Sequence, residues 1–459
     1  MNRLVVVSNR VPPALDDCPA GGLASGMMAA LELSGGVWFG WNGEVEKCPT
    51  RVEERSLNNV TFATTALTAE EYQQYYCGFS NGTLWPTFHY RVDLARYDNE
   101  EYQGYLRVNR RLAQMLKPLL RPDDIIWVQD YHLLPFAQAC RSIGIHNRIG
   151  FFLHIPFPSS VIAMTIPPHR ELFSSMTDYD LLGFQTEEDH QAFRDYASRM
   201  GMSDDIVKSG VYPISVAIEP LRQLAQDNSP DLHLLDQVSR RLGRKAIFSV
   251  DRLDYSKGLP ERFSAFELLL KHYPEHRRRV QFVQFAPTTR DDISSYRQIR
   301  EQLDALAGRI NGGYSELDWL ALNYMNKNCD RRRLMGLYRQ AHVACVTPLR
   351  DGMNLVAKEY VAVQEETDPG VLVLSCFAGA ARELDAALIV NPYDPREVAA
   401  ALDRALMMPL EERIERHQSM LNILRHASID VWLRRFVDDL SRQRPAGDAG
   451  HVPCVCLRA

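Results

Sequence analysis

Two cations follow an apolar run that predicts a buried strand. The run KAIFSV at 245–250 ends just before Arg252, and Lys257 follows five positions later, where a glycine and a proline open a predicted helix. A guanidinium is a planar fork for phosphate oxygens, and an ammonium is a compact point charge. Together they suit a diphosphate. An exposed basic turn, with these cations paired to neighbouring aspartates, is the alternative interpretation.

Polar side chains also lie at the ends of other predicted strands. Arg10, Asp130 and His154 each follow or close an apolar run, and Arg290 lies in a loop after another run. In open α/β sheets, ligands bind beyond the carboxyl ends of the strands, so these positions are candidates for chemistry. The alternatives are a helix cap for Asp130, a structural imidazole for His154 and a surface position for Arg290.

The segment TPLRDGMNLVAKEYVA at 347–362 predicts a helix that begins directly after a strand. Amide groups near Leu355 and Val356 then lack helical partners. Asp351 lies just outside this helix and Glu359 lies inside it, so we expect one carboxylate near a sugar hydroxyl and the other near a ribose. Helix capping is the alternative for Asp351.

Two motifs and an aromatic group give less specific signals. Gly21 and Gly22 open a helix and let the backbone approach a ligand, although the motif is not the GxGxxG of nicotinamide and flavin sites. The DYD at 178–180 precedes a strand, so we do not expect it to hold a metal. Tyr76 and Trp85 are able to stack on a sugar ring, although aromatic side chains more often lie in a core.

Parallel sheets are the elements that bring such strand ends together. Short apolar runs alternate with helical patterns, and continuous rather than alternating runs indicate strands buried on both faces. The predicted strands are 4–8, 36–41, 60–64, 124–129, 148–154, 181–186, 210–216, 245–250, 280–286, 342–347, 371–375 and 387–391. This alternation predicts an α/β protein with two facing Rossmann-like domains and a catalytic cleft between them.

A polar stretch at 219–244 separates the two series of strands. We therefore expect an N-terminal domain at 1–220 and a C-terminal domain at 221–429. The final helix, 430–443, is assigned to the first domain, although its apolar spacing also allows packing on the second. Residues 444–459 are expected to form a loose tail.

Composition argues against several classes of protein. The 459 residues are 46% hydrophobic and 24% charged, with a net charge of −6, so we expect no general surface for nucleic acid or anionic membranes. The apolar runs are too short for a signal peptide or a membrane span. Nine scattered cysteines without a metal-ligand spacing predict reduced thiols and a cytoplasmic location.

The ordered motifs of the chain resemble those of the trehalose-6-phosphate synthase family over nearly all of residues 3–440. They are VVVSNR, GGL, WFGW, LWPTFHYR, GYLRVN, DYHLLP, NRIGFFLHIPFP, DYDLLGFQTE, DRLDYSKGLPERF, PTTRDD, TPLRDGMNLVAKEYVA, and GVLVLS followed by FAGA. The resemblance implies a B-type glycosyltransferase that moves glucose from UDP-glucose to glucose 6-phosphate, giving α,α-trehalose 6-phosphate. It also implies retention of the donor's α-configuration, no cofactor or metal, a homo-oligomer (dimer or tetramer), and a role in osmoprotection and the stress response.

By this resemblance, one group of residues binds the acceptor and another lies at the reacting centre. The residues matched to glucose 6-phosphate are Arg10, Tyr76, Trp85, Asp130 and Arg290. The residues matched to the reacting centre are Asp130, His154, Arg252, Lys257 and Asp351. An acceptor that carries its own phosphate fits arginines at two separate strand ends.

The resemblance also matches residues to the donor. The residues matched to UDP-glucose are Gly21, Gly22, His154, Arg252, Lys257, Cys329, Asp351, Leu355, Val356, Ala357, Lys358 and Glu359. Of these, Arg252 and Lys257 match the pair that holds the diphosphate. His154 and Asp351 match contacts to the donor glucose, and Glu359 matches the contact to the ribose.

The chain departs from the family pattern at three places. Gln129 stands where a histidine usually precedes DYH, and the segment 201–219 is shorter than in close relatives. Cys329 stands where an aromatic residue near the nucleobase is common. Because this last change bears on the uridine pocket, the choice among UDP-, ADP- and GDP-glucose stays open at this point.

The candidate residues also predict a mechanism. No carboxylate clearly occupies the place of a nucleophile, so we expect departure of the diphosphate from the front face rather than a covalent intermediate. Arg252, Lys257 and the helix start at 352–356 are expected to stabilise the leaving group. Two rival interpretations are a glucosylglycerol-phosphate synthase of the same fold and an inactive sugar-phosphate sensor. The aromatic and arginine set favours a hexose phosphate, and the intact cation pair disfavours a sensor.

Overall fold

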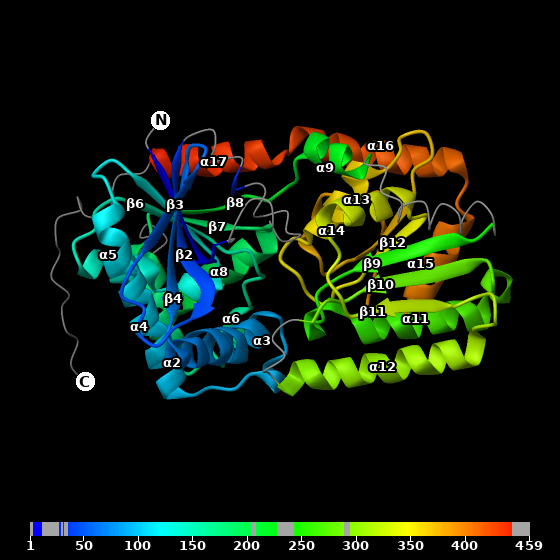
Figure 1. Ribbon diagram of the computed structural model, residues 1–459, viewed down its shortest axis with the longest axis horizontal. Helices are drawn as coiled ribbons and strands as arrows, with labels where there is room; N and C mark the ends of the chain where they lie inside the picture. Colours follow the sequence, from blue (N-terminus) through cyan, green and yellow to red (C-terminus); the bar gives the residue numbers. More distant parts are fainter. Residues whose placement is uncertain are drawn as a thin grey trace.

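Figure 1 shows the computed structural model, which describes residues 3–11, 27–28, 31, 35–202, 208–226, 243–288 and 294–442. These residues form two lobes side by side, each with a twisted sheet covered by helices. We call the lobe built on the N-terminal sheet the first lobe and the other the second lobe. No helix in the described part of the chain is long and apolar enough to cross a membrane.

The first lobe contains an eight-stranded sheet in the order β3-β4-β2-β1-β5-β6-β7-β8. Only β3 and β4 pair antiparallel, as a hairpin at one edge, and the other neighbours pair parallel. The strands are β1 (Leu4–Arg10), β2 (Gly36–Val45), β3 (Glu53–Leu57), β4 (Val60–Leu67), β5 (Ile125–Gln129), β6 (Arg148–Phe152), β7 (Leu181–Phe184) and β8 (Lys208–Val211).

Helices of the first lobe connect these strands. The α-helices are α2 (Ala69–Glu71), α3 (Trp85–Phe88), α4 (Asn99–Leu116), α5 (Phe136–Ser142), α6 (Ser160–Ala163), α7 (His169–Ser174) and α8 (Glu187–Arg199). A π-helical segment, η1 (Tyr72–Leu84), runs directly into α3, and the shorter 3-10 turns are η2 (Val92–Leu94), η3 (Lys117–Leu119), η4 (Tyr131–Leu133) and η5 (Ser175–Asp178). The longest of them, α4, begins where the Asp98 side chain accepts from the amides of Glu100 and Glu101.

The second lobe contains a six-stranded sheet in the order β11-β10-β9-β12-β13-β14, in which all neighbours pair parallel. Its strands are β9 (Lys245–Val250), β10 (Val280–Phe285), β11 (Leu322–Met325), β12 (Val343–Val346), β13 (Val371–Ser375) and β14 (Leu388–Val390). Its helices are α9 (Ile218–Ala225), α11 (Leu259–His272), α12 (Ser294–Tyr314), α13 (Arg331–Gln340), α14 (Leu355–Val363), α15 (Pro395–Met407) and α16 (Leu410–His426). Its 3-10 turns are η6 (Tyr255–Lys257), η7 (Pro274–His276) and η8 (Gly379–Arg382).

The strand order of each sheet identifies where a ligand would bind. Chain order reverses direction between β1 and β5 in the first sheet, and between β9 and β12 in the second. At such a switch point, the connections leave on opposite faces of the sheet and open a crevice beyond the carboxyl ends of the strands. The two Rossmann-like sheets that the sequence predicted are thus confirmed, and each supplies one such position.

The last helix, α17 (Ile429–Ser441), crosses back from the second lobe to the first, as Figure 1 shows at the top of the view. Its Phe436 packs against Trp127, with ring centroids 4.7 Å apart. A Cβ at Gly150 or Gly183 would lie 2.8 or 2.7 Å from the Phe436 ring, so both strands need glycine there for the helix to approach.

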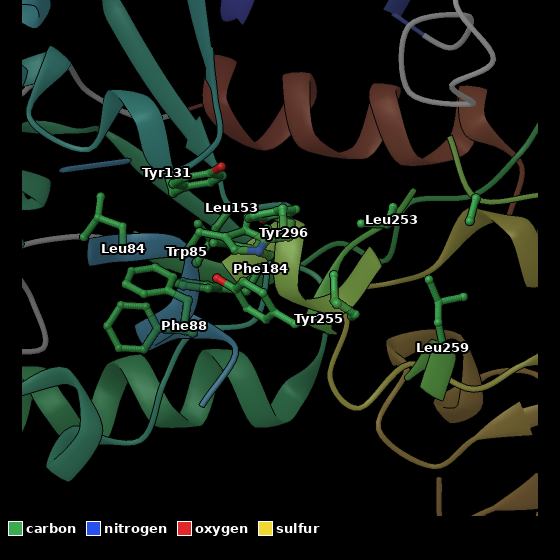
Figure 2. Close-up of a cluster of buried hydrophobic side chains, with 14 of the residues drawn as sticks. Leu84, Trp85, Phe88, Tyr131, Leu153, Phe184, Leu253, Tyr255, Leu259 and Tyr296 are labelled. Carbon is green, nitrogen blue, oxygen red and sulfur yellow. The ribbon is translucent and has the colours of Figure 1, made fainter. Parts of the chain in front are cut away.

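One cluster of buried hydrophobic side chains is continuous between the lobes. Figure 2 shows Trp85 and Tyr131 of the first lobe in the same cluster as Tyr255 and Tyr296 of the second. Apolar surface buried in this way stabilises association by roughly 25 cal/mol per Å². The two lobes are therefore held together by packing as well as by the polar contacts described below.

The predicted strands are present in the structure, with one substantial shift. The strand expected at 210–216 is β8, which begins at Lys208 and ends at Val211. Pro213 follows, and because proline lacks an N–H it cannot continue a ladder. The sequence prediction missed β3, an exposed edge strand of charged residues, and β11, a short strand with polar members.

Candidate active site

The turn after β9 is tight and depends on a glycine. Asp254 caps η6 by accepting from the Ser256 amide at 2.9 Å. Gly258 follows with a φ of 64°, and a Cβ there would lie 2.3 Å from the carbonyl oxygen of Thr347. A left-handed backbone and this close approach to the neighbouring strand end both require glycine. The turn thereby fixes the direction in which Lys257 leaves the backbone.

Lys257 and Asp351 form a close ion pair between the two central strand ends of the second sheet. The Lys257 ammonium donates to Asp351 Oδ2 at 2.6 Å. The other donors to this carboxylate are the Gly352 amide at 3.1 Å and the Asn354 side chain at 3.0 Å. Burial acts to raise the pKa of Asp351, but Lys257, with smaller contributions from His89 and Asn354, outweighs burial and holds that pKa below its usual value. Asp351 is therefore an ionised carboxylate at neutral pH.

Asn354, rather than Asp351, caps α14. Its side chain accepts from the Ala357 amide at 3.3 Å, in a left-handed conformation with a φ of 71°. The amides of Leu355 and Val356, the first two residues of the helix, have no hydrogen-bond partner within the described residues. Free amides at a helix start attract an anion.

The next two predicted donor residues of α14 are buried and engaged. The Lys358 ammonium donates to the Ile214 carbonyl at 2.6 Å and pairs with Glu383, so its side chain is directed away from Lys257 and Asp351. Glu359 accepts from Arg331 at 3.1 Å, and burial raises the pKa of Glu359. Of these two residues, Glu359 remains the candidate for a ribose contact, through its carboxylate on the α13 side of the helix.

Arg252 and Trp85 meet across the boundary between the lobes. The guanidinium carbon of Arg252 lies 5.6 Å from the centroid of the Trp85 ring, within the range of a cation–π contact. Trp85 also donates from its indole nitrogen to Asp254 at 3.4 Å, and Tyr296 donates to the other oxygen of Asp254 at 2.9 Å. An aromatic residue of the first lobe, predicted to bind the acceptor, is thus joined directly to the turn that carries the cation pair.

The residues predicted to bind the acceptor include Arg10 and Tyr76, which lie near Trp41 of β2. Arg10 lies at the end of β1, with its guanidinium 5.8 Å from the Trp41 ring. Trp41 lies 5.4 Å from Tyr76, and Tyr76 stacks on His132 at 5.9 Å. The structure therefore brings Arg10 and Tyr76 together through Trp41, which the sequence analysis did not select.

Asp130 occupies a strained backbone position next to His154. Its φ of 74° and ψ of 169° belong to a region that is normally restricted to glycine, at a cost of about 1–3 kcal/mol. Its side chain does not cap η4, and instead Oδ1 accepts from the backbone amide of His154 at 3.1 Å. Strain of this kind is concentrated at functional sites.

The remaining predicted residues lie elsewhere or outside the described part. Gly21, Gly22 and Arg290 lie outside the described residues. Cys329 is half-buried just before Arg331 and α13, and burial raises the pKa of its thiol to about 11. It is therefore a neutral thiol near the Arg331–Glu359 pair.

The DYD segment has a structural role. Asp180 is buried, and its Oδ2 accepts from Arg141 at 2.9 Å and from the Ile149 amide at 2.7 Å. The Tyr179 hydroxyl donates to the Leu133 carbonyl at 2.6 Å. These bonds tie β7 to β6 and α5.

Three contributors to the site escaped the sequence analysis as site residues. Trp41 carried a signal, because WFGW lies at the end of a predicted strand beside the switch point. Asp254 was visible only as an aspartate near the cations. Arg331 gave no signal, since its pairing with Glu359 depends on how α13 packs against α14.

The chain is similar to characterised proteins over almost its full length. A trehalose-6-phosphate synthase of Sodalis glossinidius (strain morsitans) is 51% identical over 457 residues, which cover 96% of each chain. The structure of an E. coli homologue bound with UDP-2-fluoro glucose matches with a TM-score of 0.92 at 50% identity, covering 97% of this chain and 100% of that one.

A further solved structure carries the other ligand. It is an α,α-trehalose-phosphate synthase (UDP-forming) from Burkholderia xenovorans in complex with glucose-6-phosphate, with a TM-score of 0.91 and 50% identity, covering 96% of this chain and 100% of that one. The family model that matches residues 11–442 is that of Glycosyltransferase family 20. Because this match spans every strand of both sheets except β1, and every described site residue except Arg10, the chain belongs to glycosyltransferase family 20.

Proposed function

We propose that the protein transfers glucose from UDP-glucose to glucose 6-phosphate, giving α,α-trehalose 6-phosphate and UDP. The observation that carries the proposal is the contact of Arg252 with Trp85, 5.6 Å apart, which joins the switch point of one sheet to the aromatic wall beside the other. A transferase for two phosphorylated sugars needs two anion sites that share one reacting centre. The relatives bound to a UDP-glucose analogue and to glucose-6-phosphate support this pairing of substrates.

Stabilisation of the leaving diphosphate is the main catalytic effect in this proposal. Negative charge develops on the diphosphate as the bond to the sugar breaks, and prearranged donors lower the energy of that state. Arg252, Lys257 and the free amides of Leu355 and Val356 are the donors at the carboxyl edge of the second sheet. These groups supply the charge that a divalent cation supplies in other transferases, so we propose that the reaction needs no metal.

The proposal of a front-face mechanism with retention rests on the hydrogen bonds and ion pairs that already engage the nearby carboxylates. A double displacement needs an ionised carboxylate that is free to attack the sugar. Asp351 is held by Lys257, and Asp254 is completely buried and accepts from Trp85 and Tyr296. The remaining carboxylate of the predicted reacting centre, that of Asp130, accepts from the His154 amide through Oδ1. We therefore propose front-face attack, in which the acceptor hydroxyl gives its proton to the departing phosphate oxygen. Its oxygen then bonds to the sugar carbon on the face that the phosphate leaves.

The acceptor site is proposed to lie along the aromatic wall of Trp41, Tyr76 and Trp85. Arg10 at the end of β1 is proposed to bind the 6-phosphate, together with Arg290. Asp130 and His154 are proposed to orient the sugars at the reacting centre. Their fixed backbone, tied by the 3.1 Å bond from the His154 amide to Asp130, suits an orienting role.

The experiment is a product assay with purified protein. The full chain is incubated with glucose 6-phosphate and, in parallel, with UDP-, ADP- or GDP-glucose, and the products are identified by mass spectrometry and by NMR of both anomeric protons. We expect a disaccharide phosphate with two α-anomeric centres and release of UDP. A product formed only when glycerol 3-phosphate replaces glucose 6-phosphate would contradict the proposal and favour the glucosylglycerol-phosphate synthase.

We also infer a cytoplasmic location and a homo-oligomeric state. In the described part of the chain, the six cysteines Cys48, Cys77, Cys140, Cys329, Cys345 and Cys376 are all free thiols. Unpaired thiols are typical of a reducing compartment. Light scattering of the purified protein measures its mass, and a dimer or tetramer is expected, whereas a monomer at all concentrations would contradict this inference.

A further inference from the structure

The ring of His154 lies between two glutamine side chains from neighbouring strand ends. Its Nε2 lies 2.8 Å from Oε1 of Gln129, at the end of β5. Its Nδ1 lies 3.4 Å from Nε2 of Gln185, which follows β7. Both glutamines are buried, with 3% and 2% of their surface exposed, so water does not compete for these bonds.

Backbone groups fix which end of each amide faces the ring. The Ile214 amide donates to Oε1 of Gln185 at 3.0 Å, so the NH2 group of Gln185 must face His154. The NH2 group of Gln129 faces the Trp127 carbonyl at 3.5 Å, so its Oε1 faces His154. A carbonyl oxygen accepts only, and an amide NH2 donates only.

We infer that Gln129 and Gln185 together hold His154 as the neutral tautomer with its proton on Nε2, so that the ring is a fixed, uncharged surface beside the donor sugar and neither gives nor takes a proton during transfer. Nε2–H donates to Gln129, and the bare Nδ1 accepts from Gln185. Gln129 is a positioning residue that acts through His154. The functional part of this inference rests on the proposed glucosyl transfer, whereas the tautomer itself follows from the hydrogen-bond network alone.

The surroundings of the ring disfavour its charged form. A proton on Nδ1 would face the NH2 group of Gln185, donor against donor. Burial also lowers the pKa of His154 to about 3. The nearest carboxylates do not neutralise a charged ring, because Asp130 bonds to the backbone amide of His154 and Asp351 pairs with Lys257.

The neutral ring has a consequence for the reaction. Glycosyl transfer passes through a sugar with oxocarbenium-like positive charge. A charged imidazolium beside that sugar would oppose the transition state, whereas a neutral ring with a lone pair on Nδ1 does not. Gln129 carries an amide, so this chain fixes the proton with a group that does not itself titrate.

The direct test is nitrogen NMR of the full chain labelled with ¹⁵N-histidine. The signals of His154 are assigned among the 13 histidines by their loss in His154→Asn. We expect a protonated Nε2 and a bare Nδ1 that do not titrate between about pH 5 and 8, the range in which an ordinary histidine changes charge. A proton on Nδ1, or a charged ring near pH 7, would overturn the inference.

A variant connects the tautomer to catalysis. Gln129→Glu places a carboxylate at Nε2, and an opposite charge at that distance raises a histidine pKa by about 1–3 units. Raised from about 3, the pKa reaches at most about 6, so the charged ring forms as the pH falls, and we expect kcat at about pH 5.5 to drop by up to about fourfold relative to pH 8, with the KM for glucose 6-phosphate unchanged. The matched control is Gln191→Glu, which adds the same charge at an exposed helix position.

The outcomes separate this inference from the proposed function. NMR shows whether the His154 ring becomes charged in Gln129→Glu. If it does, but the pH profile of kcat equals that of Gln191→Glu, a proton on His154 is harmless to transfer and the inference is wrong. If Gln129→Glu does not fold, the NMR measurement of the His154 tautomer in the unchanged protein decides the inference alone. If no disaccharide phosphate forms at all, the proposed function fails, while the NMR result still confirms or overturns the tautomer.

Discussion

The Lys257 ammonium lies 2.6 Å from Oδ2 of Asp351, although 94 positions separate the two residues along the chain. The pair joins the turn after β9 to the segment after β12, which are the two strands at the switch point of the second sheet. Asp351 is ionised, and it also accepts from the Gly352 amide and from Asn354. Lys257 is therefore held in place beside the free amides at the start of α14 before any ligand binds.

Removal of either cation should reduce turnover far more than acceptor binding. Arg252→Ala and Lys257→Ala each delete a donor to the leaving diphosphate, and loss of one such donor costs on the order of 10²–10³ in kcat. The KM for glucose 6-phosphate should change little, because the proposed ligands of the acceptor phosphate are Arg10 and Arg290 rather than these two cations. Steady-state kinetics with each substrate varied gives both values. Lys271→Ala, at an exposed position of α11, is the control, and near-normal turnover in both variants would remove the argument for a diphosphate site.

Gly352 sets how closely the two lobes approach. A Cβ at this position would lie 1.9 Å from the carbonyl oxygen of His154, so Gly352→Ala must push the second lobe away from the first. A displacement of about 1 Å at a reacting centre costs on the order of 10²-fold in rate, and we expect kcat to fall by that factor. Gly312→Ala in α12 is the control, because a Cβ there meets nothing within 4 Å.

The two glycine variants should differ in stability as well as in rate. Alanine in a helix interior is favoured over glycine by about 0.5–1 kcal/mol, and Gly312 lies in the last turn of α12, so Gly312→Ala should unfold at an equal or slightly higher urea concentration with unchanged kcat. Wild-type kcat in Gly352→Ala would mean that the lobes do not need this contact during transfer.

His89 should make the protein sensitive to acid. Burial lowers the pKa of His89 from 6.5 to about 4. Below about pH 6.5 the unfolded chain binds a proton that the folded chain does not, so the stability present above that pH is lost as the pH falls toward 4, by about 3 kcal/mol in all. In His89→Gln this part of the decrease in unfolding free energy with falling pH should disappear, as measured by urea unfolding from about pH 7 to 4. His426→Gln, at an exposed position, should keep the full slope, and equal slopes in both variants would contradict the assignment.

Chelation should leave the activity unchanged. Among the described residues, Oδ2 of the DYD aspartate Asp180 accepts hydrogen bonds from Arg141 and the Ile149 amide. The proposed leaving-group donors are cations and amides of the chain itself. Turnover measured with and without EDTA should therefore agree. Complete loss of turnover in EDTA, restored by Mn²⁺, would return DYD to consideration as a metal site.

Much of the fold was predictable because local sequence encodes it. Runs of apolar residues such as KAIFSV at 245–250 are buried whichever neighbours they pair with, so their identity as strands follows from composition alone. The same holds for the residues at strand ends. Arg10, Asp130 and Arg252 lie at or just after the ends of such runs, and parallel sheets bring carboxyl ends to one edge. The ordered motifs predicted the family.

The tertiary structure decided the strand order and the contacts between distant side chains. Nothing local places β9 beside β12, or Arg252 over Trp85, because these approaches depend on how whole sheets and helices pack. Two cations next to two aspartates in DRLDYSK leave several pairings open. Packing selects one of them by burying Asp254 against Trp85 and leaving Lys257 to a carboxylate on another strand end.

The state of His154 shows the same division most clearly. The sequence determined that a histidine ends a buried strand, with Gln129 ending the strand before it. Only the folded chain brings Gln129 and Gln185 to opposite sides of one ring. The position of a single proton depends on the orientation of each amide, and backbone groups at Trp127 and Ile214 fix those orientations through contacts that no local pattern encodes.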